Sequence, residues 1–380
     1  MELQEIFIPI NVKDELDIDL FSDDCWFNSV EIHERDFPSL VGKKIALFTI
    51  VSNKNDKSNN IIRNYLYAMT KKEFGKIVAD LGTFVYDPIE ESIHSKLAYV
   101  LSELQSEGII PLMIGSSQES TYSQYLAYEF LKKYCSLVTI DSRIDFMMDE
   151  NEEVQDKNYL FQILSKDPTY LFNLSFLAFQ TFMTDSKTIE LMESQHFETV
   201  RIGKIRDNFE DVEPVIRNAD FISFDISAIR QADAPGSQIS SPAGLQVEEA
   251  CKLLRFAGLS DSLSSMGIYG YNYKKDFNNQ TAHLIAQMIW YFVDGVIHRY
   301  NEVLIGDPIN YVKYIATNNS SSQQLTFYKS KKTGRWWMEI PSFDKDMQGK
   351  EVIACSYKDY EMATKGEVPE RWWRSLKRWS

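Results

Sequence analysis

The stretch Val138–Phe146, VTIDSRIDF, places two carboxylates, Asp141 and Asp145, directly after a short β-branched run. An apolar run of this length that ends in polar residues predicts a buried strand. Carboxylates in such a place often hold a cation or take part in acid–base chemistry. Arg143 stands between them, however, and a guanidinium is itself a cation that binds no metal. The stretch thus predicts a sheet strand whose end once suited a cation.

Outward from this strand, apolar runs alternate with segments of helical periodicity. The other predicted strands lie in KKIALFTIVS, IIPLMIG, TVRIG, DFISFDIS and SMGIYGYNY. The predicted helices lie in NIIRNYLYAM, IHSKLAYVLSELQSEG (with Gly108 as its cap), TYSQYLAYEFLKKY, VEPVIRNA, QVEEACKLLRFAG and TAHLIAQMIWYFVDGVIHRYNEV. Strands that are apolar throughout and alternate with helices predict an α/β fold, a parallel sheet with helices on both faces.

The two ends of the chain depart from this pattern. Residues 1–41 are acidic and irregular and predict an N-terminal extension packed on an α/β body of residues 42–316. In the C-terminal extension, residues 317–380, QQLTFYKSKKTGRWWMEIP predicts a β-hairpin with its turn near Thr333 and Gly334. Paired tryptophans beside arginines can form a binding surface, but the simpler expectation is that they pack the extension onto its own body. The tryptophans of this extension are Trp336, Trp337, Trp372, Trp373 and Trp379.

Composition excludes several classes of function. A hydrophobic fraction of 44% and a charged fraction of 25% are those of an ordinary globular protein. The net charge of −15 argues against nucleic-acid binding, which needs clustered Lys and Arg. The four cysteines show no CxxC spacing, which indicates unpaired thiols in a reduced compartment. With neither a basic leader region nor an apolar run of roughly 20 residues, we expect a cytoplasmic protein without membrane insertion.

Polar residues follow three of the predicted strands. IIPLMIGSSQEST carries Gln118, VTIDSRIDF carries the two aspartates, and FISFDISAIRQADAPG carries Asp225 and Ser227. Ligands bind outside the carboxyl ends of parallel strands, so we expect these side chains to meet. Each motif alone is weak because Asp often caps the next helix. The three motifs in this order, with APG nine residues after Asp225, are more specific.

With these motifs the chain resembles the arginase/ureohydrolase superfamily, from about residue 42 to residue 300. GIIPLMIGSSQES corresponds to the family's G-G-D-H-S, TIDSRIDF to D-A-H-x-D, and SFDISAIRQADAPG to S-F-D-x-D…A-P-G. The resemblance is to formimidoylglutamase-like members, and the Trp-rich tail is similar to that of a subgroup. It implies a three-layer αβα fold with a central parallel sheet of about eight strands, and hydrolysis of guanidinium or amidine C–N bonds by a bridged manganese pair.

The resemblance also carries the family's metal-ligand positions onto this chain. One ion of the pair would use Gln118, Asp141, Asp145 and Asp225, and the other Asp141, Arg143, Asp225 and Ser227. Gln118, Arg143 and Ser227 replace two histidines and an aspartate of the family. The second position has therefore lost both of the ligands that it does not share with the first.

Arg143 is expected to take the place of a metal ion. Manganese prefers carboxylate, carbonyl, water or imidazole, so a guanidinium excludes it. Three aspartates without a cation would repel one another, and a guanidinium can pair with two of them. We therefore predict a degenerate metal site with no metal cofactor and no bridging hydroxide. The simpler alternative is that Arg143 turns to solvent while the aspartates cap helices.

Two functions remain open. The first is a catalytically inactive pseudoenzyme with a binding or assembly role. Its partner would be another protein or further copies of the chain, or a small amidine or guanidine ligand beside Glu249, which matches the family's guanidinium-facing acid. The bland explanation for Glu249 is a helix N-terminal glutamate.

The alternative function is a formimidoylglutamase-like hydrolase of linear amidine C–N bonds. It would use a single Mn²⁺ or Mg²⁺ ion, held by the oxygen ligands of Gln118, Asp141, Asp145 and Asp225. No histidine lies inside the three motifs to substitute as an acid–base group; the histidines are His33, His94, His196, His283 and His298.

Overall fold

The main sheet is built as the alternation of strands and helices predicts. The structure is a computed structural model that describes residues 3–53, 60–87, 92–146, 159–302, 307–317, 324–341 and 351–377. Eight strands run parallel in the order β4-β3-β5-β10-β9-β6-β7-β8, which confirms the predicted sheet. These strands are β3 (Ile45–Val51), β4 (Val78–Val85), β5 (Ile110–Gly115), β6 (Cys135–Ile140), β7 (Leu171–Leu177), β8 (Glu198–Val200), β9 (Phe221–Asp225) and β10 (Ser265–Tyr269).

The sequence pattern predicted neither β4 nor β7. Asp80 and Gly82 interrupt the apolar run of β4, and Asn173 and Ser175 interrupt that of β7. Asp80 is nonetheless fully buried, because Arg63 from α2 pairs with it. A buried polar group is tolerated where a partner satisfies it, and such a partner is invisible in local sequence.

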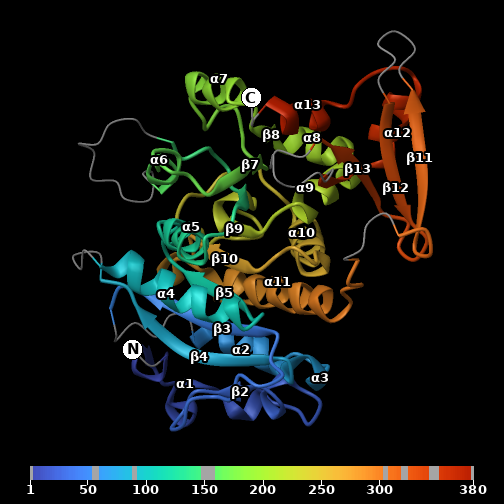
Figure 1. Cartoon of the computed structure of the whole chain (residues 1–380). Helices are drawn as coiled ribbons and strands as arrows, with labels where there is room; N and C mark the ends of the chain where they lie inside the picture. The colour runs from blue at the N-terminus through green and yellow to red at the C-terminus, as the bar shows by residue number, and fades with distance from the viewer. Residues whose placement is uncertain are drawn as a thin grey trace.

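Helices cover both faces of this sheet, so the predicted three-layer αβα architecture is confirmed (Figure 1). One hydrophobic cluster lies under α2, α8, α9, α10 and α11, and a second lies under α4, α5, α6 and α7. No helix in the described ranges is both long and apolar enough to cross a membrane. The helices are α2 (Asn60–Ala68), α4 (Ile93–Ser106), α5 (Ser120–Leu131), α6 (Tyr159–Leu164), α7 (Ser186–Ser194), α8 (Ile202–Asp207), α9 (Glu213–Arg217), α10 (Val247–Leu259) and α11 (Gln280–Ile297).

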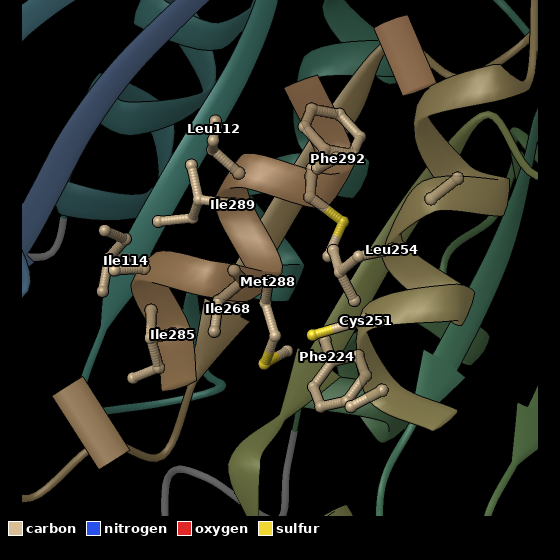
Figure 2. Close-up of a cluster of buried hydrophobic side chains, with 14 of the residues drawn as sticks. Leu112, Ile114, Phe224, Cys251, Leu254, Ile268, Ile285, Met288, Ile289 and Phe292 are labelled. Carbon is tan, nitrogen blue, oxygen red and sulfur yellow. The ribbon is translucent and has the colours of Figure 1, made fainter. Parts of the chain in front are cut away.

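The packing of α10 and α11 onto the sheet forms a large part of the first cluster. Figure 2 shows Leu254 of α10 and Met288 of α11 facing Phe224 of β9 and Ile268 of β10. The two helices approach closely at Gly258, where an added Cβ would lie 2.1 Å from the carbonyl oxygen of Phe292. This rigid layer holds the carboxyl ends of β9 and β10 in place.

The N-terminal residues add two short strands at the β4 edge. β1 (Phe7–Ile8) pairs antiparallel with β4, and β2 (Glu31–Ile32) pairs parallel with it. The short helix α1 (Val12–Glu15) lies between them in the chain, whereas the short helix α3 (Lys72–Gly75) belongs to the body and precedes β4. The segment therefore packs on the body, while the domain boundary at residue 41 stays a prediction.

A second sheet follows the α/β body and lies at the opposite end of the molecule from the N-terminal segment (Figure 1). Its β12–β13 pair is the predicted hairpin, with Gly334 in the turn at a φ of +74°. The sheet is larger than that hairpin, and its first strand begins before residue 317. Its elements are β11 (Tyr311–Thr317), β12 (Gln324–Ser330), β13 (Trp336–Ile340) and β14 (Glu351–Cys355), followed by α12 (Tyr357–Thr364) and α13 (Glu370–Lys377).

The tryptophans of this extension pack mostly inward, as the simpler expectation has it. Trp336, Trp337 and Trp372 are buried, whereas Trp373 is 43% exposed. Arg217 of α9 stacks on the Trp337 ring at 4.3 Å from its centroid and donates to the Trp336 carbonyl. The extension therefore docks on its own body, and Trp379 lies outside the described residues.

Asp220, just before β9, makes stability depend on pH. Burial raises its pKa to about 6, although its Oδ2 accepts a hydrogen bond from the Ser136 amide. When folding raises the pKa of an acid, the protein loses stability as the pH rises from the pKa of the unfolded state to that of the folded state. We expect Asp220→Asn to gain about 2 kcal/mol over wild type between pH 4 and pH 7 in urea unfolding. A stability difference that is equal at both pH values would contradict this assignment.

Candidate functional site: a carboxylate cluster at the strand ends

Three strand ends converge at the carboxyl edge of the sheet. Gln118 follows β5, Asp141 follows β6, and Asp225 ends β9. β9 pairs with β6 on one side and with β10 on the other, and β10 pairs with β5. The sheet order therefore brings the motifs to one place, as parallel strands do.

Ser227 connects two of the carboxylates. Its hydroxyl donates to Asp141 Oδ1 at 2.6 Å, and its backbone N–H donates to Asp225 Oδ1 at 2.6 Å. Asp225 is the N-terminal cap of the short 3₁₀ helix Ile226–Ala228, so Ser227 lies in its first turn. Ser227, one of the positions where the resemblance expects a metal ligand, therefore joins Asp141 and Asp225. By the resemblance, these are the two aspartates that both ions would share.

Arg143 turns toward the carboxylates. Its Nε forms an ion pair with Asp145 Oδ1, and its Nη2 donates to Asp145 Oδ2 at 3.3 Å. Its backbone N–H also donates to Asp141 Oδ1 at 3.3 Å. The Asp145 side chain is 7% exposed and that of Arg143 is 22% exposed. The structure therefore places the guanidinium over Asp145 rather than in solvent.

The three carboxylates make this site favourable for a positively charged partner. Burial and the negative charge of Asp141 together raise the pKa of Asp225 to about 8. Burial and then Asp141 raise the pKa of Asp145 well above its usual range, which Arg143 partly offsets. Burial also raises the pKa of Asp141 against the hydrogen bond from Ser227. One guanidinium among three buried aspartates leaves the cluster short of cationic partners.

Gln118 is held at the edge of this cluster by a buried polar network. Its Nε2 donates to Ser223 Oγ at 3.0 Å, and Ser223 in turn lies 2.7 Å from Thr121 Oγ1. Gln118 is 3% exposed, and its Oε1 finds no donor among the described residues. Such a buried acceptor suits a cation or a donor from outside the protein.

Glu249 takes part in local structure at the start of α10. It closes a capping box by accepting from the Gln246 amide at 2.8 Å, and it pairs with Arg206 Nε at 3.3 Å. Within the described residues, no recorded contact joins it to the aspartate cluster. These contacts match the bland explanation, while its role toward a ligand stays a prediction.

Sequence reasoning missed two residues near the site. Burial and the charges of the three aspartates raise the pKa of the Tyr159 hydroxyl well above its usual range, so this hydroxyl feels the field of the cluster. His94 contacts Glu119, the neighbour of Gln118, at 3.2 Å and also bonds Tyr86 and Ser123. Both are far in sequence from the motifs they approach, which left no local signal.

The fold and this edge define an α/β protein of the ureohydrolase type. The Arginase family model matches residues 57–294, and the chain belongs to the arginase family. It is similar to the formimidoylglutamase of Streptococcus gordonii, with 22% identity over 53% of this chain and 65% of that protein. It is also similar to the Bacillus subtilis enzyme, with 19% identity over 49% of this chain and 61% of that protein. The chain thus spans slightly less than two thirds of the length of these relatives.

Solved structures share the fold. A Trypanosoma cruzi formiminoglutamase with Mn²⁺ matches with a TM-score of 0.61 and 16% identity, over 69% of this chain and 96% of that one. The Bacillus subtilis formimidoylglutamase matches with a TM-score of 0.63 and 18% identity, over 73% of this chain and 94% of that one. At this identity the likeness shows the fold alone.

The residues present do not fit a bridged pair of metal ions. The second position offers a guanidinium at Arg143 and a hydroxyl at Ser227 that already donates to Asp141. Arg143 also engages both oxygens of Asp145, a ligand of the first position. Within the described part of the chain, no three His, Cys, Asp or Glu side chains are arranged to hold a metal. The first position keeps only Gln118, Asp141 and Asp225 as oxygen donors that Arg143 leaves available.

Proposed function

We propose that this chain is a catalytically inactive member of the arginase family with a binding or assembly role, in which Arg143 replaces a metal ion. The observation that carries the proposal is the two-point pairing of its guanidinium with Asp145. A guanidinium stays protonated at all physiological pH values and offers donors only, so it cannot share its place with a cation.

The loss of one ion removes the chemistry. Hydrolysis by this fold depends on water whose pKa is lowered by metal ions, and a hydroxide between two ions needs both positions. His94 contacts Glu119, which lies within one of the motifs, and it also hydrogen-bonds Tyr86 and Ser123. Its hydrogen-bond partners within the described residues include none of the three aspartates, so it is not joined to the carboxylate cluster.

The partner of such a protein would bind the acidic N-terminal extension or the Trp-rich C-terminal extension. We propose either further copies of the chain or another protein as partner, in a reduced compartment such as the cytoplasm. The carboxylates at the strand ends would suit a small amidine or guanidine ligand, with Glu249 as a further candidate contact. Free buried cysteines are consistent with that compartment.

A second candidate is a single-metal amidine hydrolase. The buried, unpartnered Oε1 of Gln118 favours it, as do relatives named formimidoylglutamase. One Mn²⁺ or Mg²⁺ would then be held by Gln118, Asp141 and Asp225, with Asp145 available only if Arg143 released it.

Hydrolysis assays separate the two candidates. Wild type with added Mn²⁺ or Mg²⁺ would be incubated with formimidoylglutamate, arginine and agmatine, beside the Bacillus subtilis formimidoylglutamase as positive control. We expect no formamide or urea above the buffer rate. Metal-dependent turnover that disappears in Gln118→Leu would establish the single-metal hydrolase instead.

A further inference from the structure

Ser142 lies between Ser227, one of the replaced ligand positions, and the retained carboxylate of Asp141. Its side chain is completely buried, and its backbone carbonyl accepts from the Gln180 amide at 2.8 Å. Its Oγ lies 2.9 Å from Ser227 Oγ and 3.3 Å from Asp141 Oδ1. Ser142 therefore contacts both a replaced position and a retained carboxylate.

The hydrogens in this group can be assigned by counting. Ser227 has one hydroxyl hydrogen, and the 2.6 Å contact gives it to Asp141 Oδ1. The Ser142 hydroxyl is then the donor at the 2.9 Å contact with Ser227 Oγ. The result is a chain of hydrogen bonds from Ser142 through Ser227 to Asp141, in which each bond strengthens the next in a buried site.

This chain extends to the second carboxylate. The Ser227 backbone N–H donates to Asp225 Oδ1, so Ser227 holds two aspartates at once. Both aspartates are buried acids that repel each other, and hydrogen bonds to the charged form reduce that penalty. Arg143 neutralises Asp145 on the other side of the cluster. Each carboxylate thus has a protein donor.

We infer that Ser142 is a positioning residue, and that the Ser142–Ser227 hydroxyl bridge holds Asp141 and Asp225 together where a metal ion would otherwise do so. This inference rests on the proposed replacement of the ion by Arg143. The replacement is then a unit of three residues, Ser142, Arg143 and Ser227. Reverting Arg143 and Ser227 alone should therefore restore metal binding, but with an affinity that the remaining Ser142 weakens.

Metal titration tests the unit. Manganese binding to Arg143→His, Ser227→Asp would be measured by calorimetry beside the same variant with Ser142→Ala added. We expect the triple variant to bind about tenfold more tightly, because Ser142 no longer competes for Asp141. The control adds Ser260→Ala instead, a buried serine whose hydroxyl donates to the Arg217 carbonyl outside the cluster, and it should equal the double variant. Equal affinity of the triple and double variants would overturn the inference.

A thermal cycle in the wild-type background tests the bridge without metal. Ser142→Ala, Ser227→Ala and the pair would be melted side by side. The effects of substitutions within one hydrogen-bonded chain do not add. The melting temperature of the double variant should therefore fall by about 2 °C less than the sum of the two single falls. Additive losses would overturn the bridge. If coupling appears but neither reverted variant binds manganese, the bridge stands and the replacement of an ion by Arg143 fails.

Discussion

Arg63→Leu is expected to lower the free energy of unfolding by about 3–5 kcal/mol, because it leaves a buried charge without a partner. Arg63 is 1% exposed and Asp80 is fully buried. The Arg63 Nε and Nη2 donate to the Asp80 carboxylate at 2.8 and 3.1 Å, and Nη2 also donates to the Gly82 carbonyl at 2.7 Å. Tyr67 donates to the same carboxylate. Urea unfolding followed by circular dichroism measures the loss.

Two variants make this test specific. Asp80→Leu added to Arg63→Leu removes the orphaned charge and should recover a large part of the lost stability. Lys358→Met breaks a pair with Asp211 in which the lysine is 62% exposed, and should cost less than about 1 kcal/mol. A loss for Arg63→Leu no larger than that for Lys358→Met would contradict the structural role of the buried pair.

Arg143→His, Ser227→Asp is expected to change the protein from one that excludes manganese to one that binds it, with about two equivalents per chain at saturation. The change supplies an imidazole and a carboxylate at the second position, and both are ligands that Mn²⁺ accepts. It also releases both oxygens of Asp145, which Arg143 engages in wild type. Equilibrium dialysis with metal analysis measures the gain.

The matched control is Arg143→Leu, Ser227→Ala, which removes the same two groups without supplying ligands. It should bind far less manganese than the reverted variant, and it should be less stable than wild type because Asp145 loses its partner. Equal manganese binding by the control and reverted variants would show that clearing the site, rather than restoring ligands, governs metal uptake. Failure of the reverted variant to bind any manganese would count against Arg143 standing in a metal position.

Much of the fold follows from local sequence, and its exceptions have physical causes. Apolar runs predicted the buried strands on both sides of the site, and Gly334 marked the turn of the C-terminal hairpin. The pattern missed β4 because Asp80 is buried only through its pairing with Arg63 of α2, a tertiary contact. It gave no sign of β11 or β14, since these strands are ordered by pairing with that hairpin.

The residues of the candidate site also divide into those that local sequence predicts and those that it does not. Arg143 and Asp145 share one short motif, so their pairing could be predicted from spacing and charge, whereas Arg143 reaches Asp141 through its backbone N–H. Ser142 carries no local signal within that motif, because its partner Ser227 is 85 residues away. Tyr159 lies outside the motifs, and the effect of the aspartates on its hydroxyl arises only in the folded chain. Residues that act through long-range contacts are beyond the reach of local patterns.

The most direct test of the central claim is the metal content of wild-type protein. It would be purified without chelator from manganese-supplemented cells and analysed by plasma mass spectrometry beside the reverted variant. If Arg143 has replaced the ion, wild type should carry less than about 0.1 equivalent of metal while the variant carries a substantial amount. One equivalent or more of bound metal in wild type would contradict the claim.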